Sequence, residues 1–230
     1  MLVRWSITSH TGTQLNTSDG TVALGGTHGG DFMRFDRRIV LAALAAAVAV
    51  PLASAQDLHP SRRPSPLGMA RTMLDDAYVR VVYGRPYKRD RKNIFGTKES
   101  GAVVVYGERW RTGANEATEL TVTRDVLFGG QKLPAGTYSL STTPAPGTWK
   151  VHLNSKLGLD GLGTFANDTF TPVDLPPTDV LTVSAPATEL PEDKEVDQLT
   201  FEFEKTAAGT DMVLRWIRTE VRVPIALAKG

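Results

Sequence analysis

The chain has 230 residues, 41% of them hydrophobic, which is enough to bury one complete core. Its net charge is +1, and residues 56–230 alone carry 22 basic and 22 acidic residues. A neutral domain has no electrostatic reason to bind nucleic acid or an anionic membrane surface. The sequence contains no cysteine, which excludes disulfides, thiolate metal sites, cysteine nucleophiles and a lipidated cysteine anchor.

A targeting pattern begins at Met33. Three arginines follow within five residues, residues 39–52 are uncharged and rich in Ala, Val and Leu, and Ala53–Ala55 supplies small residues for cleavage. The apolar run is shorter than the roughly 20 residues that a membrane span needs. The sequence therefore predicts a signal peptide at 33–55 and an exported protein, periplasmic or secreted, without a stable membrane anchor.

Two further segments are expected to lie outside the folded domain. Residues 1–32 are rich in Thr, Ser and Gly and show no periodicity, and we interpret them as a mis-called or disordered extension before a true start at Met33. Residues 56–70 contain three prolines and predict an exposed lead-in.

Short runs of β-branched and aromatic residues then recur between turn signals. Alternation places Leu120 with Val122, and Trp149 with Val151 and Leu153, on buried faces. Residues 155–179 and 185–197 are expected to be long loops. No helical period persists for three turns, so the sequence predicts one antiparallel β-sandwich or jelly-roll-like domain over 71–227. The expected strands are Tyr78–Tyr83, Ala102–Tyr106, Thr118–Thr123, Leu127–Phe128, Thr137–Thr142, Thr148–Asn154, Val180–Ser184, Leu199–Phe203, Met212–Ile217 and Val221–Ile225.

Several strings identify a family resemblance. They are YGRPYKRDRKNIFG from Tyr83, YGERWRTGANEATEL from Tyr106, GGQKLPAGTYSLSTTP from Gly129, and Leu214-x-Trp216 followed by Val221-x-Val223-Pro224. The chain resembles the uncharacterised bacterial family known as domain of unknown function 2911 over about residues 62–226. The resemblance implies an exported, mostly β protein, and implies no particular activity.

The densest polar cluster lies between two expected strands, and two interpretations compete for it. In the structural one, Trp110 anchors the core, Gly113 takes a turn conformation, Asn115 binds the turn backbone, and Arg111 pairs with Glu116. The cluster comprises Arg109, Arg111, Thr112, Asn115, Glu116 and Thr118.

In the functional interpretation, the rim of the domain presents Arg111, Asn115 and Glu116 to a ligand, with Arg85 adding positive charge. An Arg fork, an Asn amide and a carboxylate together suit a small polar ligand or glycan. The basic run 88–92 lacks interleaved aromatic residues and is expected to be a solvated loop, with no nucleic acid as partner.

Catalytic patterns are weak. Residues 56–230 contain only two histidines, His59 and His152, so no metal site and no cofactor is expected. Glu116 could serve a glycan-acting or other hydrolase, although nothing selects its partner among Glu108, Glu119 and Asp125. The sequence favours binding of a polar ligand or envelope partner over catalysis. It leaves open a hydrolase and a purely structural envelope protein, and it does not predict the oligomeric state.

Overall fold

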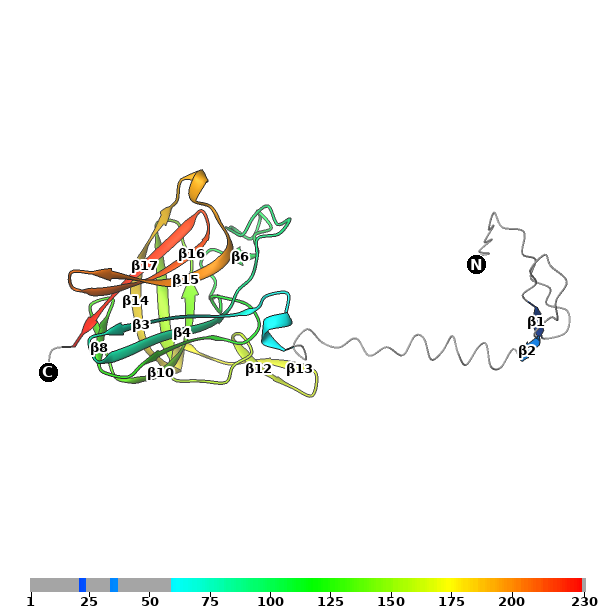
Figure 1. Ribbon diagram of the computed structural model, residues 1–230, viewed down its shortest axis with the longest axis horizontal. Coiled ribbons are helices and arrows are strands. Elements are labelled where there is room, and N and C mark those ends of the chain that lie inside the picture. Colours follow the sequence, from blue (N-terminus) through cyan, green and yellow to red (C-terminus); the bar gives the residue numbers. More distant parts are fainter. Residues whose placement is uncertain (1–20, 24–33, 37–58, 229–230) are drawn as a thin grey trace. The chain divides into compact units, whose positions relative to one another are not determined.

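The computed structural model describes residues 59–228 and the short strands at 21–23 and 34–36 (Figure 1). The chain divides into two units, Met1–Ala53 and Ser54–Gly230. In the first, β1 (Thr21–Ala23) pairs antiparallel with β2 (Arg34–Asp36). Apart from these two strands, the expected extension at 1–32 and signal peptide at 33–55 lie outside the described residues. No helix in the described parts of the chain is long and apolar enough to cross a membrane.

The second unit is built from β-strands and three short 3-10 helices, and residues 59–228 contain no α-helix. The 3-10 helices are η1 (Pro60–Arg62), η2 (Pro176–Thr178) and η3 (Glu192–Lys194). The strands are β3 (Leu67–Leu74), β4 (Ala77–Gly84), β5 (Phe95–Gly96), β6 (Val104–Val105), β7 (Thr118–Val122), β8 (Val126–Phe128), β9 (Gln131–Leu133), β10 (Gly136–Thr143), β11 (Thr148–Asn154), β12 (Gly163–Ala166), β13 (Thr169–Pro172), β14 (Asp179–Glu189), β15 (Val196–Thr206), β16 (Gly209–Ile217) and β17 (Thr219–Leu227).

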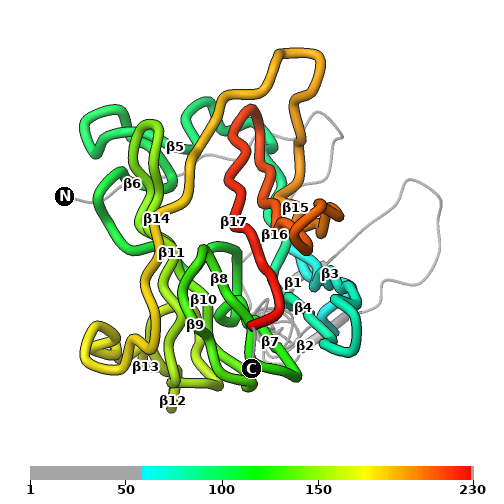
Figure 2. The backbone as a smooth tube through the Cα atoms, turned by 90° about the vertical axis from the view of Figure 1, so that its left-hand side faces the viewer, coloured from blue at the N-terminus to red at the C-terminus, as the bar shows by residue number. Residues whose placement is uncertain are grey.

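One large sheet organises this unit. Its strand order is β15-β16-β17-β14-β11-β10-β7-β4-β3, and β8 pairs with β17 and β9. All of these neighbours are antiparallel. Figures 1 and 2 show the sheet curling round on itself. The prediction of a mostly antiparallel β domain is confirmed. The two layers that face each other across the core belong to one nearly closed sheet.

The two ends of the sheet meet where β4 and the segment after it approach β15. The Leu199 N–H donates to the Pro86 carbonyl at 2.9 Å, and the Lys88 N–H donates to the Asp197 carbonyl at 2.7 Å. Further along, the Phe201 N–H donates to the Tyr83 hydroxyl at 2.8 Å. A side-chain hydroxyl thus satisfies a buried β15 amide where no neighbouring strand backbone does so.

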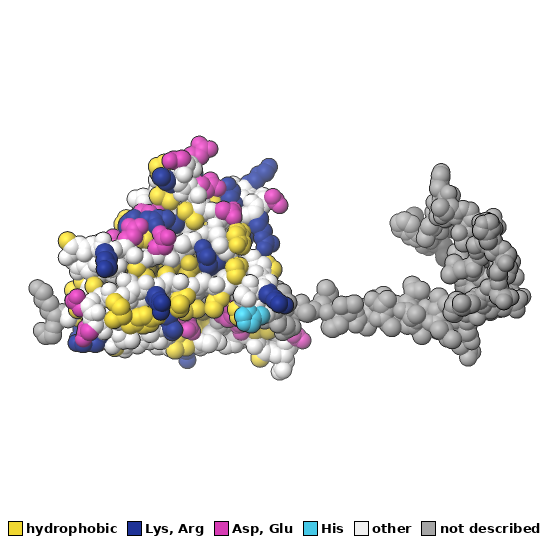
Figure 3. Space-filling model, viewed as in Figure 1, with side chains coloured by type: hydrophobic (Ala, Val, Ile, Leu, Met, Phe, Trp, Pro, Cys, Tyr) yellow, Lys and Arg dark blue, Asp and Glu magenta, His cyan; other side chains and the backbone are white. Residues whose placement is uncertain are grey.

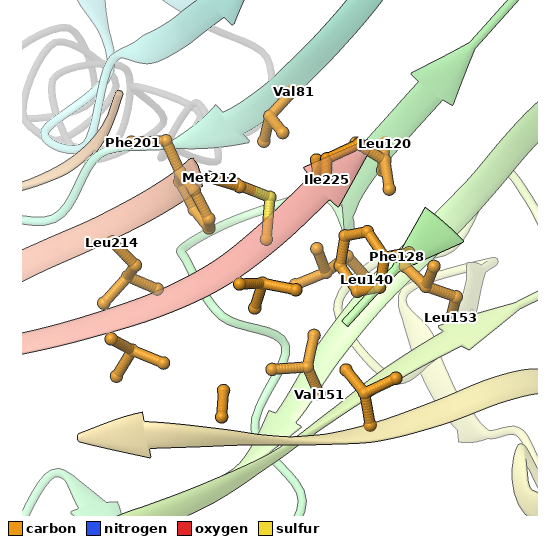
Figure 4. Close-up of a cluster of buried hydrophobic side chains, with 14 of the residues drawn as sticks. Val81, Leu120, Phe128, Leu140, Val151, Leu153, Phe201, Met212, Leu214 and Ile225 are labelled. Atoms are coloured by element: carbon orange, nitrogen blue, oxygen red, sulfur yellow. The ribbon is translucent and has the colours of Figure 1, made fainter. Parts of the chain in front are cut away.

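The interior follows from alternation along each strand. In β4 and β7 every second residue is buried, and the predicted inner pair Leu120 and Val122 is 0% and 1% exposed. Figure 4 shows labelled side chains from strands around the barrel pointing into one common space, among them Val81, Phe128 and Leu214. Each such side chain contributes about 1.5–3 kcal/mol when fully buried, so the core dominates the stability of the fold.

Several segments differ from expectation. β5 and β9 are strands where none was expected, β15 begins at Val196 inside an expected loop, and the expected strand Ala102–Tyr106 is reduced to β6. β3 begins at Leu67, inside the expected lead-in, and β14 continues to Glu189, inside an expected loop. The other expected loop contains the β12–β13 hairpin, whose Asn167 and Asp168 both have positive φ. This hairpin has an almost wholly exposed surface, so it shows none of the buried-face alternation that reveals a strand.

The outer face of β3 carries apolar side chains in solvent. Leu67, Met69 and Met73 are each about half exposed. Figure 3 shows apolar atoms gathered in a band along this part of the molecule, interrupted by basic side chains. Isolated exposed apolar residues are common, and a band of this kind is less so.

Candidate functional site

Residues 107–117, here called the polar loop, connect β6 to β7 and lie beside β10 and the end of β4. Trp110 and Thr142 exchange both of their backbone hydrogen bonds, at 2.7 and 2.9 Å, which attaches the loop to β10. The Thr112 hydroxyl donates to the Trp110 carbonyl at 3.1 Å, and the Thr118 hydroxyl donates to the Thr112 carbonyl at 2.9 Å. The Trp110 ring stacks on Trp216 with centroids 5.9 Å apart, which agrees with the expected anchoring role of Trp110.

A pair of glycines lets the polar loop lie close to β4. A Cβ on Gly84 would stand 1.9 Å from the Ala114 carbonyl oxygen, and one on Gly113 would stand 2.9 Å from the Gly84 oxygen. Gly113 lies in a bend, as the structural interpretation expected, and the positive φ angles of this bend are at Thr112 and Asn115. Glycine is needed at 113 for close backbone approach rather than for a special conformation.

Arg109, a residue of the polar loop, is occupied by an ion pair. Its guanidinium donates to both carboxylate oxygens of Asp179, at 2.9 and 2.7 Å, and to the Ser141 hydroxyl at 2.7 Å. Asn154 donates a further bond to Asp179 at 2.9 Å. Burial raises the pKa of Asp179, but the bonds and charge from Arg109 and the Asn154 bond outweigh it and lower the pKa. This network fastens the loop to β11 and β14.

Two of the four predicted ligand-binding residues are also used by the fold. The Arg85 guanidinium donates to the Leu199 carbonyl at 3.1 Å and to the Thr200 hydroxyl at 2.9 Å, across the closure of the barrel. The Asn115 amide donates to the Ser65 carbonyl at 2.9 Å, rather than to the backbone of its own turn.

Glu116 is held by a partner that the sequence did not suggest. Arg63 donates to its two carboxylate oxygens at 2.5 and 2.7 Å, and the Arg63 side chain is only 9% exposed, against 48% for Glu116. The expected pair between Arg111 and Glu116 is therefore wrong. Burial raises the pKa of Glu116, but the Arg63 hydrogen bonds and charge, with a backbone hydrogen bond, outweigh it and lower the pKa.

Arg111 makes no hydrogen bond or ion pair with any residue between 59 and 228. Its side chain lies against Gly161, where an added Cβ would be 3.0 Å from the Arg111 Cδ. Although Arg111 is exposed, the protein around its guanidinium removes enough water to lower its pKa. Arginine still remains charged at neutral pH.

A cavity of about 360 Å³, here called the Glu116 cavity, opens between the end of the polar loop and residues 158–160. Carboxylates of Glu116, Glu119 and Asp160 line it. Apolar walls come from Leu67 and Leu159, among others. Of the predicted residues only Glu116 borders this cavity; Arg111, Asn115 and Arg85 do not.

The two histidines within residues 59–228 are placed apart. His59 caps η1, and His152 lies on β11 between the hydroxyls of Thr143 and Thr182, at 2.9 and 3.0 Å. Burial and the Arg109 charge lower the pKa of His152 despite the opposing charge of Asp179. Within the described residues, no group of three or more His, Asp or Glu side chains is arranged to hold a metal ion.

The geometry defines a class: a nearly closed antiparallel barrel with a polar loop beside a carboxylate-lined cavity. The family model described as "Protein of unknown function (DUF2911)" matches residues 65–225, and the chain belongs to this family. No curated protein and no solved structure matches the chain.

Proposed function

We propose that the protein is exported and binds a small hydroxylated ligand, such as a carbohydrate, in the Glu116 cavity, without catalysing a reaction. The observation that carries this proposal is the Arg63–Glu116 pair at the cavity edge, in which the single guanidinium nitrogen Nη1 donates to both carboxylate oxygens. Arg63 fixes the Glu116 carboxylate in one orientation. The remaining lone pairs of this carboxylate can therefore accept hydrogen bonds from a ligand, and binding costs little further side-chain entropy.

The lining of the cavity supports a ligand rich in hydroxyl groups. Glu116, Glu119 and Asp160 offer acceptors, and Leu67 and Leu159 offer apolar surface. Carboxylates accept from hydroxyls, while the apolar walls suit the C–H faces of a sugar ring. Three carboxylates with one paired arginine also disfavour an anionic ligand.

Hydrolysis by Glu116 is the second candidate, and the electrostatics disfavour one form of it. A general acid must be protonated near the working pH, but Arg63 keeps the pKa of Glu116 below its ordinary value. Glu116 could then act only as a base or nucleophile, with Glu119 in the same cavity as partner. A purely structural role is the third candidate, supported by the uses that the fold makes of Arg85 and Asn115.

The test is a calorimetric titration of mono- and oligosaccharides into the wild type and three variants. Glu119→Gln should weaken binding about tenfold, because it replaces one charged acceptor, while Glu108→Gln, exposed and outside the cavity, should leave binding unchanged. Glu116→Gln should weaken binding at least as much and also lower the melting temperature, because the Arg63–Glu116 ion pair is lost.

Three results would count against the proposal. Equal binding by Glu119→Gln and Glu108→Gln would exclude the cavity as the site. Turnover of any bound glycan, lost in Glu116→Gln, would favour the hydrolase. Absence of binding across the panel would favour the structural role. For export, N-terminal sequencing of protein from the extracytoplasmic fraction should begin at Gln56.

A further inference from the structure

A second cavity, of about 500 Å³, lies at one end of the barrel. Five segments form it: the stretch around β5 and β6, the β10–β11 turn, the end of β14, Glu195 just before β15, and the β16–β17 turn. Figures 1 and 2 show these segments gathered at the same end. This end cavity shares no lining residue with the Glu116 cavity.

The inner side of the end cavity is aromatic. Phe95, Tyr106 and Trp149 line it, and the Phe95 ring meets Trp149 edge to face with centroids 5.0 Å apart. Behind them Trp216 packs on Phe95 at 5.7 Å, with the Arg91 guanidinium 5.6 Å from its ring centre. Phe95 and Trp149 pack against each other, so their rings lose little freedom when another ring binds against them.

The rim of the end cavity carries one unpaired positive charge. Lys88 pairs with Glu195 at 2.6 Å, and Arg218 pairs with Glu189 at 3.0 Å. The fifth charged lining residue, Lys92, is exposed and makes no ion pair or hydrogen bond within residues 59–228. Two matched pairs and one free ammonium favour a ligand with a single negative charge.

A strained residue completes the wall. Trp216 pairs with Thr219, so Ile217 and Arg218 form a two-residue turn in which Ile217 has a φ of +49°. Glycine is the usual residue at this conformation, and a β-branched side chain there is an outlier. Leu190 holds the turn through its N–H to the Arg218 carbonyl, at 2.6 Å. The turn thus keeps a costly backbone conformation while Ile217 supplies an apolar wall to the cavity.

We propose that the end cavity binds a small aromatic carboxylate, with its ring against Phe95 and Tyr106 and its carboxylate at Lys92. The ring surface selects a flat apolar group, and the uncompensated ammonium selects the anion. This proposal is independent of the Glu116 cavity, because neither its residues nor its ligand charge is shared with that site.

The test measures binding of benzoate to the full chain. Calorimetry and saturation-transfer NMR, both at millimolar ligand, detect the binding. Benzoate should bind, whereas benzyl alcohol and cyclohexanecarboxylate, which lack the charge and the flat ring respectively, should bind about tenfold more weakly. Glucuronate, a carboxylate on a sugar ring, should also bind more weakly. Binding of glucuronate at least as tightly as benzoate would overturn the aromatic assignment.

Two variants separate the charge from the ring. Lys92→Gln should weaken benzoate about tenfold and leave benzyl alcohol unchanged, and Lys98→Gln, exposed and outside the cavity, should change neither. Tyr106→Leu should weaken benzoate and benzyl alcohol alike. No benzoate binding by the wild type, or an affinity unchanged in Lys92→Gln, would overturn the proposal, whatever the outcome at the Glu116 cavity.

Discussion

Removal of the Asp179 carboxylate should destabilise the barrel more than any surface charge does. Asp179 accepts two bonds from Arg109 and one from Asn154, and both members of the ion pair are only 16% exposed. In Asp179→Ala the Arg109 cation would stay largely buried without its carboxylate. The variant therefore loses the pair and keeps the desolvation cost of the remaining charge.

The size of the effect follows from this burial. Breaking a buried pair from one side costs roughly 3–5 kcal/mol, and Arg109 retains its bond to Ser141, so about 3 kcal/mol is expected. For a domain of this size each kcal/mol lowers the melting temperature by about 2–4 °C, which gives a fall of about 6–12 °C. Folded domains have an unfolding free energy of about 5–15 kcal/mol. The expected loss is a large part of this stability but smaller than the whole, so the variant should remain folded.

Thermal melting and urea unfolding followed by circular dichroism measure this loss. The matched control is Asp193→Ala, because Asp193 and its neighbour Lys194 are 75% and 69% exposed and 4.0 Å apart, and such pairs contribute less than about 1 kcal/mol. The double variant Arg109→Ala/Asp179→Ala should be less destabilised than the sum of the single ones. If Asp179→Ala melts within error of Asp193→Ala, the stabilising role of this network is refuted.

The same carboxylate predicts acid sensitivity. Its pKa is lowered in the folded state, so its stabilising contribution is present above the unfolded value of about 3.9 and is lost as the pH falls through the folded one. The difference in stability between wild type and Asp179→Ala should therefore shrink below about pH 4.

Three further predictions concern the barrel itself. Tyr83→Phe should cost about 1–3 kcal/mol in urea unfolding, because the Phe201 N–H loses its buried acceptor; a neutral result would mean that water replaces the hydroxyl. The pKa of His152 is lowered in the folded state, so the unfolded chain takes up the proton first and stability should fall as the pH drops below about 6.5. His152→Gln should flatten the dependence of stability on pH in this range. An unchanged slope would contradict the assignment. Gly84→Ala places a methyl group 1.9 Å from the Ala114 oxygen and should shift the polar loop or prevent folding, which amide exchange would detect; native exchange protection would argue against the close approach.

The strands could be predicted wherever one face is buried and the other is wet. In β11, Trp149, Val151 and Leu153 alternate with polar residues, and their burial matches that pattern. β12 and β13 could not be found this way, since they bury almost nothing. The available signal was the Asn167-Asp168 pair, whose left-handed backbone is typical of a tight hairpin turn.

The closure of the barrel could not be predicted from local sequence patterns. A run of alternating residues predicts a strand but not its partner, and the bond from the Phe201 amide to the Tyr83 hydroxyl joins residues 118 positions apart. The Arg63–Glu116 pair is of the same kind, because Arg63 lies in a proline-rich segment that resembles an exposed lead-in. Long-range polar contacts depend on the completed fold, and sequence spacing carries no record of them.

The polar loop shows how the same residues can support two interpretations until their partners are known. Asn115 donates to a backbone carbonyl, and its polarity needs no ligand to explain it. Arg111 differs, because it makes no polar contact within residues 59–228 and still has its charge partly desolvated beside Gly161. Because the Arg111 charge makes no stabilising polar contact within residues 59–228, Arg111→Ala should leave the free energy of unfolding nearly unchanged. If Arg111→Ala instead melts several degrees lower, its stem packs against residues 155–162 as a structural element, and the loop would then have no predicted residue left for a ligand except Glu116.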